Sequence, residues 1–119
     1  MSEPDTYALF QEGRRRLQEG MPAQATVPLE QARRAEPGKA SIREALGIAY
    51  FRLGRWPEAE AEFRTILEVT PVDAYAHYAL ARCLDKLGRP DEATGHYKLS
   101  RFLEPDETGA PRAVDDLRD

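Results

Sequence analysis

The stretch SIREALGIAYFRLGRWPEAEAEFRTILEVTP, residues 41–71, contains the pattern that decides the fold. In its first half, apolar residues recur at steps of three and four, the spacing of a helix that buries one face. These residues are Ile42, Ala45, Leu46, Ala49 and Tyr50. Gly54 then ends this helix, because glycine readily adopts the left-handed conformation that follows a helix C-terminus. Pro57 is typical of a helix start and Pro71 of a helix end, so the stretch predicts two helices joined by a turn.

The same pattern returns 34 residues away on both sides. Five types of position keep this interval in three copies: Pro37, Pro71 and Pro105; Gly20, Gly54 and Gly88; Ala25, Ala59 and Ala93; Leu29, Phe63 and Tyr97; Gly13, Gly47 and Ala81. A fixed period of this length is the signature of a repeat protein. The sequence therefore predicts an all-α fold in a single domain, residues 1–119. It contains three helix-turn-helix units, residues 6–39, 40–73 and 74–107, and a tail at 108–119.

These positions resemble the tetratricopeptide repeat, whose 34-residue signature contains Leu-Gly, Tyr, a Gly turn, Ala, Phe or Tyr and a closing Pro. The middle copy matches at Leu46-Gly47, Tyr50, Gly54, Ala59, Phe63 and Pro71. The third copy matches at fewer positions, and the first is weaker but keeps the phase. The resemblance implies an αα-superhelix, a solenoid, that acts as a non-enzymatic module for binding other proteins.

Composition limits the other classes of function. The chain has 119 residues, of which 41% are apolar and 32% charged, and this is typical of a soluble globular protein. No apolar run is long enough to cross a membrane, and the formal charge of −4 argues against non-specific binding to nucleic acid. The acidic N-terminus does not resemble a secretory signal, and a single cysteine agrees with a reducing compartment. We expect a cytoplasmic protein.

Catalytic and metal-binding motifs are missing from the sequence. It contains no nucleophile elbow, Gly-rich phosphate loop, His-Glu-x-x-His pair or paired Cys-x-x-Cys. His77 and Cys83 are six residues apart, which places them about 120° apart around a helix, so they do not readily bind one ion. By repeat phase Cys83 aligns with the small buried Ala49. We therefore predict that His77 and Cys83 are packing residues, and we predict no metal and no cofactor.

The resemblance also implies where a partner binds. First helices of successive units would line a concave groove, and one stripe of each would contact a protein or peptide segment. The predicted contact residues are Tyr7, Phe10, Arg14, Glu44, Ile48, Phe51, Tyr75, Tyr78, Arg82 and Lys86. Exposed aromatic rings and guanidinium groups often carry binding energy, and this composition suits a segment with apolar and acidic residues. The alternative is that some of these rings pack between adjacent helices.

One well-known subclass of the family is not indicated. Its two-carboxylate clamp uses Lys and Asn at positions that carry Phe10, Arg14, Ala45, Tyr75 and Ala79 in this chain.

The middle unit also offers Ser41 and Glu44 at the spacing of a capping box, which predicts a helix start there.

Three features depart from a regular array. Pro28 falls inside the second predicted helix, where it removes an amide donor, so we expect a kink or a loosened first turn.

In the tail, Ala110, Val114 and Leu117 are spaced for a short capping helix over the third unit. Leu99 and Phe102 form an apolar pair on the outer face of the last predicted helix. The tail could cover this pair, or two copies of the chain could associate there, which makes a self-assembling scaffold the alternative function.

Overall fold

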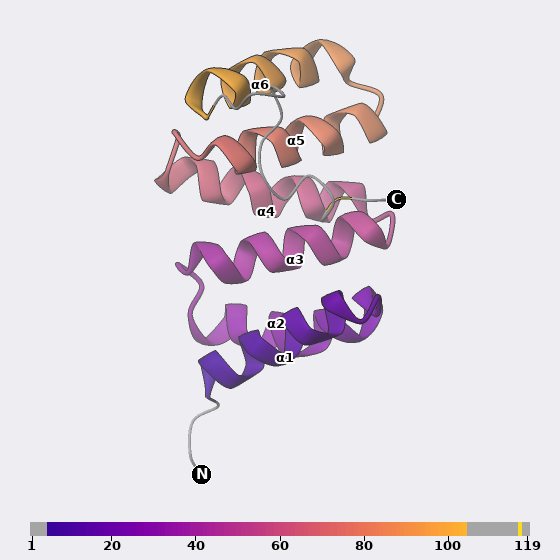
Figure 1. Cartoon of the computed structure of the whole chain (residues 1–119), viewed down its shortest axis with the longest axis vertical. Helices are drawn as coiled ribbons and strands as arrows, with labels where there is room; N and C mark the ends of the chain where they lie inside the picture. The colour runs from indigo at the N-terminus through magenta and orange to yellow at the C-terminus, as the bar shows by residue number, and fades with distance from the viewer. Residues whose placement is uncertain (1–4, 105–116, 118–119) are drawn as a thin grey trace.

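The computed structural model describes residues 5–104 and Leu117, and Figure 1 shows its helices stacked along the long axis of the molecule. Within these residues the chain forms six α-helices and no strand. The helices are α1 (Thr6–Gln18), α2 (Pro22–Ala35), α3 (Ala40–Arg52), α4 (Trp56–Val69), α5 (Ala74–Lys86) and α6 (Pro90–Leu103). The pairs α1 and α2, α3 and α4, and α5 and α6 confirm the predicted architecture of helix-turn-helix repeats.

The turns inside the units form as the sequence predicts. Gly20, Gly54 and Gly88 have φ angles of 74°, 75° and 75°, in the region that favours glycine. After Gly54 the amide of Arg55 donates to the carbonyl of Tyr50 at 2.9 Å, which satisfies an acceptor left open at the end of α3. The glycine interval of 34 residues therefore marks equivalent turns.

The helix starts differ from one expectation. Lys39 is the N-cap residue of α3 and makes no side-chain capping hydrogen bond. Ser41 lies inside the first turn, so the predicted capping box of Ser41 and Glu44 is wrong. Asp5 and Asp73 cap α1 and α5 instead, since each Oδ1 accepts from the amide three residues later, at 3.1 and 3.0 Å.

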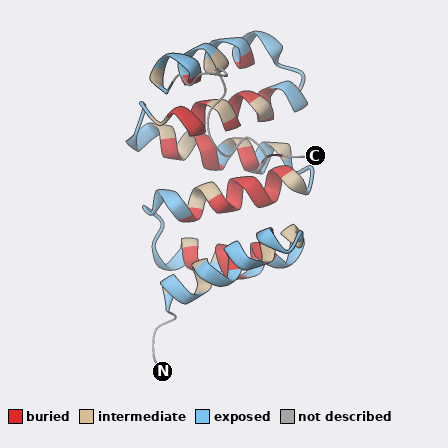
Figure 2. Cartoon of the chain, in the orientation of Figure 1, coloured by how far each residue is buried: buried red, intermediate tan, exposed pale blue. Residues whose placement is uncertain are grey.

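The first helices of the second and third units are the most buried elements. α3 contacts α2 and α4, and α5 contacts α4 and α6, so both are covered on two sides. Figure 2 shows buried residues along most of α3 and α5, whereas α1 and α6 expose much of their length. This position explains why Leu46, Ala49, Leu80 and Cys83 have no exposed surface.

Two glycines allow close packing inside the first two units. A Cβ atom on Gly13 would lie 2.3 Å from Leu29, and one on Gly47 would lie 2.6 Å from the ring of Phe63. Side chains cannot approach that closely, so these positions require a residue without a side chain. They are the small slots that the repeat pattern identified.

Pro28 does not end its helix, because α2 continues through it to Ala35. Pro28 is buried in this helix. The kink that we expect there stays a prediction.

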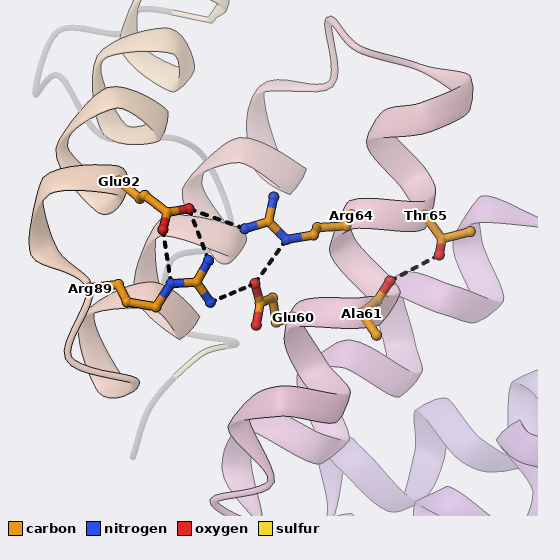
Figure 3. A network of polar contacts seen from close by, with 6 residues as sticks. All are labelled: Glu60, Ala61, Arg64, Thr65, Arg89 and Glu92. Atoms are coloured by element: carbon orange, nitrogen blue, oxygen red, sulfur yellow. Dashed lines mark hydrogen bonds and ion pairs between the residues drawn. The ribbon is translucent and has the colours of Figure 1, made fainter.

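Charged side chains connect neighbouring units. Glu62 of α4 is almost fully buried and lies between Arg33 of α2 and Arg43 of α3; the Arg43 contact is 2.9 Å. A second network joins α4 to α6 and is shown in Figure 3. In it Arg89 contacts Glu60 at 3.1 Å and Glu92 at 2.9 Å, and Arg64 contacts Glu60 at 2.8 Å.

The end of the array has an open outer face. Phe102 and Leu99 of α6 are 81% and 43% exposed, so this apolar pair is open to solvent. Ala110 and Val114, and with them the predicted capping helix, lie outside the described residues. Leu117 is described, and it is 0% exposed and part of the hydrophobic core.

Candidate functional site

The predicted contact residues lie on α1, α3 and α5, but they differ in exposure. Tyr7, Arg14 and Lys86 are exposed, Tyr7 by 69%. Phe10, Glu44, Tyr78 and Arg82 are partly buried, whereas Ile48, Phe51 and Tyr75 are buried. We call the exposed and partly buried members of this set the first-helix face. They are Tyr7, Phe10, Arg14, Glu44, Tyr78, Arg82 and Lys86.

Three of the predicted contact residues, Ile48, Phe51 and Tyr75, are buried in this structure. The ring of Phe51 is 0% exposed and meets the ring of Trp56 edge-on, with centroids 4.8 Å apart. Tyr75 packs edge-on against Phe63 of α4 at 6.5 Å. Ile48 belongs to the same core. These side chains pack between adjacent helices, which is the alternative that the sequence left open. They lie in the core beneath the first-helix face.

A small hollow opens where α1 and α3 begin. Its volume is about 70 Å³, and its lining consists of Thr6, Tyr7, Phe10, Glu36, Lys39, Ser41 and Ile42. Two predicted contact residues, Tyr7 and Phe10, therefore share one depression. The guanidinium carbon of Arg14 lies 5.7 Å from the centre of the Phe10 ring, so a cation stands beside the hollow.

A basic and aromatic group of side chains lies at the C-terminal ends of α3 and α5. Arg82 lies 5.2 Å from the centre of the Phe51 ring, and Lys86 Nζ lies 5.5 Å from that of Trp56. Arg52 donates to the carbonyl of Leu17 at 3.0 Å, which connects the end of α3 to the end of α1. We call Phe51, Arg52, Trp56, Arg82 and Lys86 the basic-aromatic cluster.

Trp56 was absent from the predicted contact residues. Its place in the repeat holds Pro22 and Pro90 in the other two units, and this departure from the pattern is a signal that could have identified it. Trp56 is half-buried and packs against the core, while Lys86 lies over its ring.

Hydrogen bonds and ring contacts hold the third unit's part of the face. Arg82 Nη1 contacts Tyr78 Oη at 3.4 Å, and the ring of Tyr78 meets that of Tyr97 at 5.8 Å. Tyr97 donates to Asp85 at 2.8 Å. Burial, together with this hydrogen bond, raises the pKa of Tyr97 above its usual value. These contacts orient the side chains of Tyr78, Arg82 and Tyr97 relative to one another.

His77 and Cys83 occupy separate environments, as the sequence predicts. His77 Nδ1 lies 2.9 Å from His96 Nδ1, and its Nε2 lies 2.8 Å from the carbonyl oxygen of Pro71. Cys83 is buried, and desolvation raises the pKa of its thiol to about 12. A thiol in this state is a poor nucleophile.

The described residues contain neither a group of metal ligands nor a helix that could span a membrane. Among residues 5–104 and Leu117, no three His, Cys, Asp or Glu side chains are grouped so that they could hold a metal ion. In the same described residues, no helix has the length and apolar character needed to cross a membrane.

Paired helices of constant length, equivalent glycine turns and a 34-residue period define an all-helical repeat protein of the solenoid class. The sequence profile of the tetratricopeptide repeat matches residues 10–68 and 44–107. The chain therefore belongs to the tetratricopeptide repeat family. Proteins of this family are generally non-catalytic interaction modules.

The curated relatives are much longer proteins. Superkiller complex protein 3 of Mus musculus is 30% identical over 108 residues, which cover 91% of this chain and 7% of the relative. Protein HemY of Escherichia coli (strain K12) is 35% identical over 78 residues, which cover 66% of this chain and 19% of the relative. The chain thus spans less than a fifth of the length of either protein.

A solved structure shows the same fold over most of the chain. The first TPR of Spaghetti (RPAP3), bound to an HSP90 peptide, superposes with a TM-score of 0.82 over 94% of this chain and 86% of that one. The sequence identity is 20%, so this likeness shows the fold alone.

Proposed function

We propose that the chain is a non-enzymatic module that binds a segment of another protein on its first-helix face. The observation that carries this proposal is the placement of cations over aromatic rings on that face, at Arg14, Arg82 and Lys86. Guanidinium groups make forked hydrogen bonds to carboxylates, and rings bury area with little loss of side-chain entropy. The preferred ligand is therefore a segment with acidic and apolar residues.

The mechanism is preorganisation. Arg82 and Tyr78 are held by contacts within the third unit, and Arg52 is held by the carbonyl of Leu17. A ligand that meets fixed side chains loses less conformational entropy on binding than one that must order them. The hollow beside Phe10 has room for one small apolar group, which gives the face a shape-selective position.

Peptide binding by a fold neighbour supports the proposal in outline. The tetratricopeptide repeat of Spaghetti (RPAP3) is bound to an HSP90 peptide. This chain carries Phe10, Ala45 and Tyr75 where the family's two-carboxylate clamp needs Lys and Asn. We therefore expect a different ligand from that of the clamp, recognised by arginine and aromatic side chains.

Charge reversal tests this surface. The double variant Arg14→Glu and Arg82→Glu should reduce capture of partner proteins at least tenfold in a quantitative pulldown, because it replaces attraction to acidic segments by repulsion. Arg101→Glu is the matched control, since Arg101 is exposed on α6, away from the first-helix face. Equal capture by the double variant and the control would refute the assignment.

A second candidate function is self-assembly through the open end of the array. The exposed Phe102 and Leu99 favour it, because an apolar pair exposed on one helix face is a candidate surface for association. Light scattering at high concentration would then show a dimer that Phe102→Glu converts to a monomer. A monomeric mass at every concentration would exclude this function.

A further inference from the structure

One position at the start of the first helices differs in the middle unit. The first and third units carry Tyr7 and Tyr75 there, whereas the middle unit carries Ser41. In the third unit the ring of Tyr75 is buried and packs edge-on against Phe63 of the preceding unit, with centroids 6.5 Å apart. Ser41 has no ring to place at the corresponding contact between the first two units.

The hollow described above lies at this contact. Ser41 lines it from α3, next to Ile42, and Tyr7 and Phe10 line it from α1. A position that holds a buried ring between the second and third units thus holds a short side chain beside an open space between the first and second. A side chain from another molecule can enter that space.

Hydrogen bonds orient both walls of the hollow. On the α1 side, Gln11 donates to Tyr7 Oη at 2.6 Å. On the other side, Arg43 donates to the carbonyl of Pro37 in the segment between α2 and α3, at 2.8 Å, and it also contacts Glu62 at 2.9 Å. A ligand that meets oriented walls loses less conformational entropy than one that must order them.

The size of the hollow specifies the side chain. A cavity of about 150 Å³ accommodates the six carbons of benzene, so a hollow of about 70 Å³ suits the three carbons of an isopropyl group. The rings of Tyr7 and Phe10 and the aliphatic Ile42 provide an apolar lining. Leucine and valine both end in an isopropyl group, whereas a phenylalanine ring is too large.

Cations beside the hollow favour a carboxylate near that isopropyl group. Lys39 lines the hollow with a side chain that is 58% exposed, and the guanidinium carbon of Arg14 lies 5.7 Å from the centre of the Phe10 ring. Glu36 also lines the hollow, but its Oε1 lies 4.0 Å from Lys39 Nζ, and an exposed pair at this distance is weak. Lys39 can therefore turn to a ligand carboxylate.

We propose that the hollow binds the isopropyl tip of a leucine or valine in a partner segment, and that an adjacent acidic residue of that segment contacts Lys39. This inference rests on the proposed function, because it names the side chain that the first-helix face selects. The ligand side chain fills a place between the first two units as Tyr75 does between the last two.

The test uses the full chain and short peptides with blocked ends. The first is acetyl-Gly-Leu-Asp-Gly-amide, and in three others Ala or Phe replaces Leu, or Asn replaces Asp. Titrations followed by backbone amide NMR should show shifts at Phe10, Ser41 and Ile42 with the first peptide, at a dissociation constant on the order of 1 mM. The Ala and Phe peptides should bind at least about fivefold more weakly. Equal binding of all the peptides would overturn the inference.

A variant that fills the hollow tests its location. Ser41→Tyr introduces the side chain that the third unit carries at the equivalent position, and it should weaken binding of the leucine peptide at least about tenfold. Ser41→Ala is the matched control, because it removes the hydroxyl group and leaves the space open. It should bind like the unmodified chain. Unchanged binding by Ser41→Tyr, or an equal loss in Ser41→Ala, would refute the site.

A second pair of variants guards against misfolding of Ser41→Tyr, which far-UV circular dichroism would reveal. Lys39→Glu leaves the hollow open and reverses the charge at its edge, so it should weaken binding of the Leu-Asp peptide about threefold or more. Lys98→Glu makes the same change at an exposed position of α6 and should bind like the unmodified chain. Equal binding by these two variants would contradict the contact with the acidic residue.

The outcomes separate this inference from the proposed function. If no peptide binds while Arg14→Glu with Arg82→Glu abolishes partner capture, the face binds partners and the hollow does not anchor them. If Ser41→Tyr blocks the leucine peptide while charge reversal leaves partner capture intact, the proposed function fails and the hollow stands as a separate site.

Discussion

At the scale of single residues, Gly47 shows how closely the helices of one unit approach. A Cβ atom there would lie 2.6 Å from the ring of Phe63, which is 0% exposed. In the third unit the equivalent slot holds Ala81, but the residue equivalent to Phe63 is the half-buried Tyr97. The close contact between the small slot and its partner side chain therefore occurs in the first two units, where the partners Leu29 and Phe63 are fully buried.

We predict that Gly47→Ala lowers the free energy of unfolding by about 1–2 kcal/mol. Overpacking costs about 1–3 kcal/mol, and the better helix propensity of alanine offsets up to about 1 kcal/mol of that. Gly95→Ala is the control, because nothing lies within 4 Å of its Cβ position in α6. It should raise stability by about 0.5–1 kcal/mol. Urea denaturation followed by circular dichroism measures both, and a stabilised Gly47→Ala would contradict the packing.

The pair His77 and His96 has a defined arrangement of protons. The carbonyl of Pro71 can only accept, so His77 Nε2 carries the hydrogen that it donates to this oxygen, and in that tautomer His77 Nδ1 can accept. His96 Nδ1 must therefore donate in the 2.9 Å contact. Burial, with the nearby His77 and Arg64, lowers the pKa of His96, and Glu92 only partly opposes this.

This pair predicts acid sensitivity in the third unit. The unfolded chain takes up a proton at His96 near pH 6.5, and the folded chain does so at a lower pH. The stability that neutral His96 contributes is therefore fully present above about pH 6.5, and it is lost as the pH drops through the pKa of His96 in the folded chain. His96→Gln keeps an amide donor for His77 but does not titrate. Between pH 7 and 5 it should lose less stability than the unmodified chain in thermal denaturation, and equal losses would contradict this prediction.

At the scale of helices, one buried carboxylate joins the first two units. Glu62 of α4 is 4% exposed and is enclosed by Arg33 of α2 and Arg43 of α3. Removal of one member of a buried ion pair leaves charges without compensation. The triad of Glu62, Arg33 and Arg43 thus connects the second unit to the first.

Glu62→Ala should destabilise the protein by about 3 kcal/mol, at the low end of the range for buried pairs, because both arginines keep part of their side chains in water. Glu12→Ala removes an exposed carboxylate that contacts Arg15 and Arg16 on α1, and it should change stability by less than about 1 kcal/mol. Chemical denaturation compares the two variants. Similar losses of stability in the two variants would show that the buried contacts of Glu62 contribute no more than an exposed ion pair.

The helices themselves were predictable because their signals are local. The apolar spacing, the glycine turns and the prolines at helix ends each act within a few residues, and the 34-residue interval repeats them. Burial of Phe51 was not predictable in this way. It depends on Trp56 of the next helix and Arg82 of the next unit, and no local pattern specifies those contacts.

At the scale of the whole molecule, one hydrophobic cluster extends from Leu17 of α1 to Ala93 of α6. Helices of adjacent units also contact each other, α2 with α3 and α4 with α5. In a repeat protein, such interfaces determine whether units unfold separately or together. We propose that the three units form one cooperative domain.

This proposal predicts a single unfolding transition. Fluorescence of Trp56, the only tryptophan, reports on the middle unit, and far-UV circular dichroism reports on all helices. The two signals should give the same midpoint in urea, and the calorimetric and van't Hoff enthalpies should agree. An earlier midpoint by circular dichroism would show that an outer unit unfolds separately.

Equivalent positions carry different chemistry in the three units, although their backbones are alike. The positions of Arg43 and Glu62 hold His77 and His96 in the third unit, and Leu9 and Pro28 in the first. If α3 paired with α6 during folding, Arg43 would face His96 and lose its carboxylate, while Glu62 would lose a cation. These mismatches disfavour helix pairings shifted by one repeat, so the interior distinguishes units that the repeat pattern makes nearly interchangeable.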